Sequence, residues 1–177
     1  MANLINLLTL SRILLAPIIF LNLVFDNYLL CLIFFSIAGL TDYFDGYLAR
    51  KYNSESQLGE ILDPIADKIL VIFIFIGLSV TLDSYLIGIM SSFIISREIG
   101  IAALRDYSAR NSLSDKTKVT FLAKVKTSAQ LFTIGLYLLA LALDFNLLIV
   151  ISDIMLIIST LITLYTGYEY IIKVLRS

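Results

Sequence analysis

Long apolar runs, separated by short polar connections, dominate the sequence. Six of these runs reach about 20 residues, the length that crosses a bilayer as an α-helix. The pattern predicts membrane helices at 7–25, 29–50, 61–81, 85–107, 121–143 and 147–172, preceded by a short interfacial segment at 1–8. The connections leave no room for a further domain. We therefore expect residues 1–177 to form one all-α, membrane-embedded domain.

Composition supports a membrane protein and excludes several other classes. Hydrophobic residues make up 59% of the chain, whereas soluble proteins hold about 45–50%. The net charge of -1 gives no electrostatic basis for binding nucleic acid. The chain has no histidine, which excludes histidine bases and histidine–metal sites. Its single cysteine, Cys31, lies in an apolar run and predicts no disulfide framework.

Charge placement predicts the orientation. Connections near 26–28, 82–85 and 144–146 carry aspartates and no basic residue. Most basic residues fall at the opposite ends of the helices: Arg50, Lys51, Arg110, Lys116, Lys118, Lys124, Lys126, Lys173 and Arg176. The positive-inside rule then places both termini in the cytoplasm. Lys116 and Lys118 are best explained as such topogenic charges or as contacts to anionic lipids. The small size and lack of an evident targeting signal favour a bacterial inner membrane.

Four aspartates flank the connection between the second and third predicted helices. Asp42 and Asp45 are three residues apart, and Asp63 and Asp67 are four apart, so each pair shares one helix face. The short connection makes the two helices antiparallel neighbours. The four carboxylates are therefore predicted to converge near the cytoplasmic surface.

Such a cluster needs compensating positive charge. An aspartate at mid-bilayer costs roughly 2.5–3.5 kcal/mol on insertion scales, which disfavours a purely structural role for all four. Arg50 and Lys68 are the basic residues nearby in sequence, and divalent cations neutralise such a cluster better. Oxygen-only ligands favour Mg²⁺ or Mn²⁺ over Zn²⁺. Two such ions suit displacement at phosphorus.

The spacing of this segment resembles a known family signature. Asp42-x2-Asp45-Gly46-x2-Ala49-Arg50-x8-Gly59-x3-Asp63-x3-Asp67 matches the pattern of the CDP-alcohol phosphotransferases at all eight positions. The resemblance implies that family's six-helix membrane fold and, usually, a homodimer. It also implies that Asp42, Asp45 and Asp63 hold two Mg²⁺ or Mn²⁺ ions, with Asp67 as partial ligand and general base.

The donor implied by this resemblance is CDP-diacylglycerol, whose tails stay in the membrane lipid. Its head group is expected at Asp42, Gly46, Ala49, Arg50 and Gly59, together with Asn6 and Thr9. The last two share a helix face with Arg12, which suggests a polar cleft in the first span. An interfacial anchor, with Arg12 extended to the membrane surface, is the alternative.

Basic residues inside later spans predict a second anion site. We expect an acceptor phosphate to contact Arg97, Arg105, Arg110, Lys124 and Lys126, because intramembrane basic residues are usually functional and arginine binds phosphate well. A buried structural Arg97–Glu98 ion pair is the alternative explanation for that pair.

Three shorter motifs resemble the phosphatidylglycerophosphate synthase branch of the family. They are Asn6-x2-Thr9-x2-Arg12, Arg97-Glu98 and Lys124-x-Lys126-Thr127-x2-Gln130. This branch uses glycerol 3-phosphate as acceptor and releases phosphatidylglycerophosphate and CMP. Ala123 departs from it, since many members have glycine before the first lysine.

Other acceptors and other protein classes are also compatible with the sequence. The same chemistry could use inositol phosphate, serine or phosphatidylglycerol. Serine would leave the basic residues without a phosphate, and phosphatidylglycerol would need room for a second lipid. A divalent-metal transporter or a non-catalytic scaffold would be a different class. Transport requires a polar path to the far side, where the predicted helices are nearly all apolar.

Overall fold

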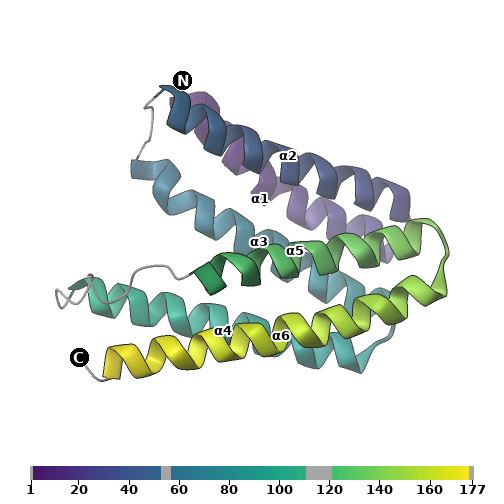
Figure 1. The fold of residues 1–177 in the computed structure, drawn as a ribbon. Coiled ribbons are helices and arrows are strands. Elements are labelled where there is room, and N and C mark those ends of the chain that lie inside the picture. Colours follow the sequence, from purple (N-terminus) through teal and green to yellow (C-terminus); the bar gives the residue numbers. More distant parts are fainter. Residues whose placement is uncertain (1, 53–56, 111–120, 176–177) are drawn as a thin grey trace.

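The computed structural model describes residues 2–52, 57–110 and 121–175. Side chains are described for these residues except at 2–6, 45–52, 57, 58, 60, 61, 109, 121–124 and 175. The described chain forms an antiparallel bundle of helices (Figure 1). These are α1 (Ala2–Val24), α2 (Tyr28–Tyr52), α3 (Gln57–Thr81), α4 (Tyr85–Arg110), α5 (Phe121–Ala142) and α6 (Asn146–Leu175). The all-α prediction is confirmed.

Five of these helices are long and apolar enough to span a bilayer. Their apolar stretches are Leu7–Val24, Leu62–Thr81, Tyr85–Ser108, Val125–Ala142 and Asn146–Val174. Within the described side chains of α2, the apolar stretch is Tyr28–Phe44. Large apolar side chains such as Leu14, Leu29 and Phe132 are exposed, as a lipid-facing surface requires. The protein is an integral membrane protein.

Two helix starts differ from the prediction. α1 already begins at Ala2, so the predicted interfacial segment forms the first turns of α1 instead of a separate element. α3 begins at Gln57 instead of 61, which places Pro64 well inside the helix. An internal proline lacks the N–H that would bond to the carbonyl four residues earlier. The aspartate end of α3 is therefore the end where its helical bonding is interrupted.

Three turns with the same backbone geometry join consecutive helices at one end of the bundle. Asp26, Asp83 and Asp144 follow α1, α3 and α5 with φ of 59°, 44° and 50°. In each turn the N–H of the residue after the aspartate donates a hydrogen bond to the carbonyl oxygen five residues earlier, as from Asn27 to Asn22 at 2.8 Å. This is the Schellman ending, which satisfies the last carbonyls of a helix. The turns confirm the connections predicted around these aspartates.

The apolar core takes buried side chains from every helix, most of them from α1, α3 and α5. α1 packs on α2 and α3, α4 packs on α3 and α6, and α5 packs on α2 and α6. The core includes Ile19, Leu23, Ile74, Phe75, Leu78, Ile87, Ile134 and Leu138. The start of α1 and the end of α6 lie at the other end of the bundle (Figure 1). Most buried charged side chains lie toward that end, where the site is found.

Candidate active site

An arginine from α1 joins three of the predicted aspartates. Arg12 Nη1 lies 2.5 Å from Asp42 Oδ1 and 2.5 Å from Asp67 Oδ1. Arg12 Nη2 lies 3.3 Å from Asp63 Oδ1. Thr9, one turn earlier on α1, donates a 2.7 Å hydrogen bond to that same Asp63 oxygen. We call Arg12, Asp42, Asp63 and Asp67 the acidic cluster.

Helix packing explains why these groups meet. α1 lies against both α2 and α3, and the four-residue spacing of Asp63 and Asp67 directs both toward α1. The Arg12 side chain is only 1% exposed, whereas the three carboxylates are 42–49% exposed. Arg12 therefore lies beneath a rim of accessible carboxylates. The alternative of Arg12 as an interfacial anchor was wrong.

The chemistry of the cluster fits divalent ions. All its acidic donors are carboxylate oxygens, the ligands that Mg²⁺ and Mn²⁺ prefer, and the Arg12 guanidinium already stands among them as a cation. Among the described side chains, no group of three or more acidic residues is yet arranged to hold a metal. Asp45 lies on α2 one turn after Asp42, and its side chain is outside the described set.

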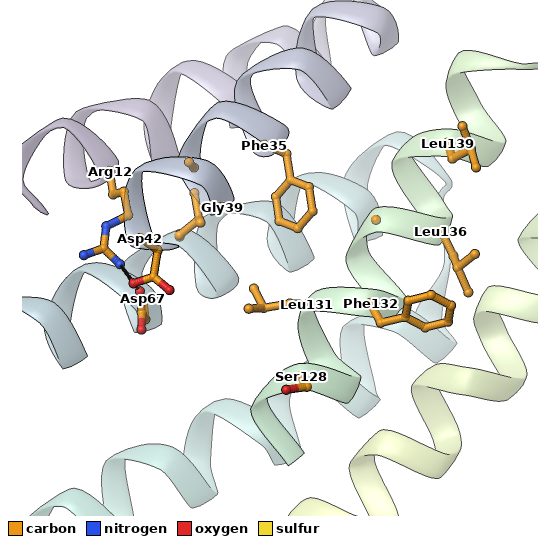
Figure 2. Close-up of a pocket in the computed structure, with 13 residues that line it drawn as sticks. Arg12, Phe35, Gly39, Asp42, Asp67, Ser128, Leu131, Phe132, Leu136 and Leu139 are labelled. Atoms are coloured by element: carbon orange, nitrogen blue, oxygen red, sulfur yellow. Dashed lines mark hydrogen bonds and ion pairs between the residues drawn. The ribbon is translucent and has the colours of Figure 1, made fainter. Parts of the chain in front are cut away.

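A large cavity extends from the acidic cluster between α2 and α5. It has a volume of about 580 Å³ and is polar at the end formed by Arg12, Asp42 and Asp67. Apolar side chains line its remainder, including Phe35, Leu131, Phe132, Leu136 and Leu139 (Figure 2). Because Gly39 and Phe132 are exposed, this lateral cavity opens on the lipid-facing surface of the bundle.

A second charged group lies between α4, α5 and α6. Glu98 Oε1 accepts hydrogen bonds from Lys126 Nζ and, at 3.1 Å, from Arg97 Nη1. Arg97 Nη2 donates to Thr166 Oγ1 on α6 at 3.0 Å. We call Arg97, Glu98 and Lys126 the basic cluster. It confirms that Arg97 and Glu98 form an ion pair within the membrane.

Glycine on α6 makes room for this arginine. A Cβ at Gly167 would stand 2.9 Å from Arg97 Cγ and 3.0 Å from Arg97 Nε. Neither distance leaves space for a methyl group. Close approach of the Arg97 side chain to the α6 backbone therefore requires glycine here.

A smaller cavity of about 140 Å³ connects the two clusters. Asp67 and Lys68 line it from α3, Glu98 from α4, and Lys126 and Gln130 from α5. Gln130 donates a 3.0 Å hydrogen bond to Thr163 Oγ1 on α6, which fixes its amide. Asp67 also lines the lateral cavity. One carboxylate thus borders a large cavity on one side and, on the other, a small cavity that also contains charged side chains.

The comparison with protein families agrees with this arrangement. The model for CDP-alcohol phosphatidyltransferases matches residues 2–166. The chain belongs to this family.

Curated relatives cover most of the chain. A Rickettsia felis protein is 36% identical over 174 residues, which is 95% of this chain and 93% of the relative. A Blochmanniella floridana protein is 39% identical over 171 residues, 94% and 88% of the two chains. An Escherichia coli K12 protein is 35% identical over 137 residues, 75% of each chain. Each is named CDP-diacylglycerol–glycerol-3-phosphate 3-phosphatidyltransferase.

Several predicted site residues of this CDP-alcohol phosphatidyltransferase lack a described side chain. Gly59 is buried in α3. Asn6 lies in α1, Asp45, Gly46, Ala49 and Arg50 lie in the last turns of α2, and Lys124 lies in the first turn of α5. Their helices place them at the same end of the bundle as the acidic cluster. Their contacts with substrate stay predictions.

The basic residues predicted for the acceptor are not all brought together. Arg97 and Lys126 meet at Glu98, and Lys126 reaches the connecting cavity. Arg105 is exposed near the end of α4. Arg110 is exposed and pairs with Asp106 at 2.9 Å. Of these four, only Lys126 lines the connecting cavity.

Two parts of the site were missed. Arg50 and Lys68 were considered as nearby basic residues beside divalent cations, and Arg12 was not, yet Arg12 pairs with Asp42, Asp63 and Asp67. Its position one turn after Thr9 was the available signal.

The contribution of α6 was also missed. Ser159, Thr163 and Thr166 are buried on one face of that helix, and their spacings of four and three residues were visible in the sequence.

Proposed function

We propose that this enzyme transfers the phosphatidyl group of CDP-diacylglycerol to glycerol 3-phosphate, giving phosphatidylglycerophosphate and CMP. The observation that carries the proposal is the position of Asp67 between the lateral cavity and the connecting cavity. The names of the relatives point to the same two substrates. The transfer requires one reacting group that both substrates can reach.

The lateral cavity suits the donor. An acyl chain would lie along Phe35, Leu131, Phe132 and Leu136, where it would displace little water and bury apolar surface. The diphosphate would then reach the polar end at Asp42. The cytidine is proposed to contact Gly46, Ala49, Arg50 and Gly59, with Asn6 and Thr9 on the α1 side.

The connecting cavity suits a small phosphorylated acceptor. Lys126 supplies a positive charge to it, and Glu98 holds the Lys126 ammonium in place. A phosphate at Lys126 would leave the hydroxyl end of a three-carbon acceptor toward Asp67. Arg97, Arg105, Arg110 and Lys124 complete the proposed acceptor set. Serine carries no phosphate for this basic residue to bind.

Asp67 is the proposed general base. It would accept the proton of the acceptor hydroxyl while the new oxygen–phosphorus bond forms and the bond from phosphorus to CMP breaks. Asp42, Asp45 and Asp63, with Asp67 as partial ligand, are proposed to hold two Mg²⁺ or Mn²⁺ ions. When bound, such ions would withdraw charge from the diphosphate and stabilise the departing CMP.

We also propose a setting for this reaction. The turns that carry Asp26, Asp83 and Asp144 would face away from the cytoplasm, and the acidic cluster toward it, in a bacterial inner membrane. The whole chain would act as one catalytic domain, within a homodimer as the family resemblance implies.

An assay of CMP release tests the proposal. The purified protein in detergent would receive CDP-diacylglycerol, Mg²⁺ or Mn²⁺, and in turn glycerol 3-phosphate, inositol phosphate, serine or phosphatidylglycerol. We expect CMP release with glycerol 3-phosphate alone, and a phosphorylated lipid product. Turnover with serine but not with glycerol 3-phosphate would reject the proposed acceptor.

A further inference from the structure

The arginine of the acidic cluster contacts carboxylate oxygens of proposed metal ligands. Arg12 Nη1 contacts Oδ1 of both Asp42 and Asp67 at 2.5 Å. The two oxygens share one nitrogen, so they are at most twice that distance apart. Arg12 thus acts as a bound cation would: its positive charge offsets the repulsion between carboxylates of two helices and holds them together.

We propose that Arg12 is an internal counter-cation that divalent ions displace from Asp42 and Asp67. The inference rests on the proposed metal binding by these aspartates. Before ions bind, Arg12 keeps the aspartates assembled. When ions bind, the guanidinium gives up the two carboxylates, so its contacts lower the metal affinity of the resting enzyme.

Geometry supports displacement. Arg12 contacts Asp42, Asp63 and Asp67 at once, so a divalent ion that binds these carboxylates would enter beside a guanidinium. The carboxylates are 42–49% exposed and Arg12 is 1% exposed. Ions can therefore approach from the open side while Arg12 stays beneath, and the carboxylates turn outward. Like charge between the guanidinium and an ion favours their separation.

The contact of Thr9 indicates which aspartates Arg12 and a metal would compete for. Its hydroxyl donates to Asp63 Oδ1 at 2.7 Å, whereas the Arg12 contact to that oxygen is longer, at 3.3 Å. Asp63 thus has a neutral donor that does not compete with a cation. The competition is confined mainly to Asp42 and Asp67, where the contacts to Arg12 are short.

A supporting role for Arg12 and a competing role predict opposite changes in metal affinity when Arg12 is replaced. If Arg12 were a support that orients the carboxylates for metal, its removal would weaken metal binding. If Arg12 competes with metal, its removal would strengthen metal binding and weaken the metal-free fold. Metal affinity measured without substrate separates the two roles without any use of turnover.

The experiment compares Arg12→Gln, Arg12→Lys and wild type in detergent after removal of metal with EDTA. Binding of Mn²⁺ is followed by electron paramagnetic resonance, and thermal unfolding is followed with and without Mn²⁺. We expect Arg12→Gln to bind Mn²⁺ about tenfold more tightly, to unfold at a lower temperature without metal, and to gain more from metal than wild type. Arg12→Lys, which keeps the charge with fewer donors, should lie between them.

The control is Arg97→Gln, which removes the buried arginine of the basic cluster. It should lower the unfolding temperature and leave the Mn²⁺ affinity unchanged. Unchanged or weaker Mn²⁺ binding by folded Arg12→Gln would overturn the inference. If Arg12→Gln does not fold without metal, the same comparison is made with Arg12→Lys. Absence of saturable Mn²⁺ binding in wild type would overturn both the metal site and this inference, whereas failure of CMP release alone would overturn only the proposed reaction.

Discussion

The two charged clusters of the bundle are inverse arrangements. In the acidic cluster, one cation contacts three carboxylates that are nearly half exposed. In the basic cluster, one carboxylate, Glu98, contacts two cations, and the side chains of Arg97 and Lys126 are 10% and 7% exposed. Among the described side chains, the acidic cluster has more negative than positive groups at an open rim, and the basic cluster has more positive than negative groups between helices.

This difference indicates two kinds of task. An open, underneutralised acidic site can accept cations and exchange contacts as they bind. Buried charges, by contrast, depend on their partners, because an unpaired charge in a low-dielectric interior is costly. The basic cluster is therefore suited to hold one ammonium, Lys126, in a fixed place. We therefore expect the acidic cluster to change its contacts during function and the basic cluster to keep its geometry.

The largest expected effect comes from the residue that borders both cavities. Asp67→Asn removes the proposed base while keeping the size of the side chain. General-base catalysis contributes about 10²- to 10⁴-fold, and Asp67 is also a proposed partial ligand. We expect turnover measured by CMP release to fall below detection, while the protein still folds and binds Mn²⁺ appreciably.

The matched control is Asp153→Asn. Asp153 is a half-buried aspartate of α6 that accepts a 2.5 Å hydrogen bond from Tyr137, far along the chain from the acidic cluster. Its replacement should change CMP release by less than about threefold, since an asparagine oxygen can accept the same bond. Full activity in Asp67→Asn would remove Asp67 from its role as base.

The next effect should come from the basic cluster. Lys126→Ala removes a charged hydrogen-bond donor worth about 1.5–3 kcal/mol, so the KM for glycerol 3-phosphate should rise about 10- to 100-fold with a smaller change in kcat. Glu98→Gln should also raise this KM, because the Lys126 ammonium loses the group that positions it. Steady-state kinetics at saturating donor measure both values.

Two further variants separate positioning from simple loss of structure. Glu98→Asp keeps the negative charge and should restore part of the acceptor affinity. The double variant of Glu98→Gln and Lys126→Ala should have a KM close to that of Lys126→Ala alone, because the two residues act on one contact. Independent, multiplying effects would show that Glu98 does not act through Lys126.

The same contrast explains what the sequence could and could not predict. Aspartates at spacings of three and four residues on two helices joined by a short connection must face a common neighbour, so their convergence was predictable. Which cation they meet was not, because Arg12 is 30 residues from Asp42 and 55 from Asp67. That contact depends on how α1 packs against α2 and α3. Helix spans follow from local patterns, whereas partners between helices follow from packing.

Basic residues illustrate the remaining gap. Arg97 and Arg110 were both predicted to bind the acceptor, because they are arginines in or just beyond the fourth predicted span. Arg97 points toward α6, where Gly167 leaves room for its side chain. Arg110 lies on the exposed end of α4. Sequence spacing along one helix gives the face of each residue, and the neighbouring helix decides what that face meets.

A smaller effect, on stability, should come from Gly167→Ala. The added methyl would meet Arg97 within 3.0 Å at two atoms, and overpacking of this kind costs about 1–3 kcal/mol. We expect a lower thermal unfolding temperature, measured in detergent, because the fixed geometry of the basic cluster cannot yield easily. Gly100→Ala is the control, since a Cβ there meets nothing within 4 Å. It should be neutral or slightly stabilising, as alanine favours a helix. Equal effects of the two variants would show that Arg97 adapts freely.

The smallest effect should come from an ion pair outside both clusters. Arg110 and Asp106 are 76% and 62% exposed and four residues apart, and such pairs contribute only about 0.3–0.5 kcal/mol. Asp106→Ala should therefore leave unfolding and kinetics nearly unchanged, as should Glu169→Ala in the similar pair with Lys173. Arg110→Ala should match them in stability but raise the KM for glycerol 3-phosphate, if the predicted acceptor contact exists. An unchanged KM would confine acceptor binding to the enclosed basic cluster and sharpen the division between buried and exposed charge.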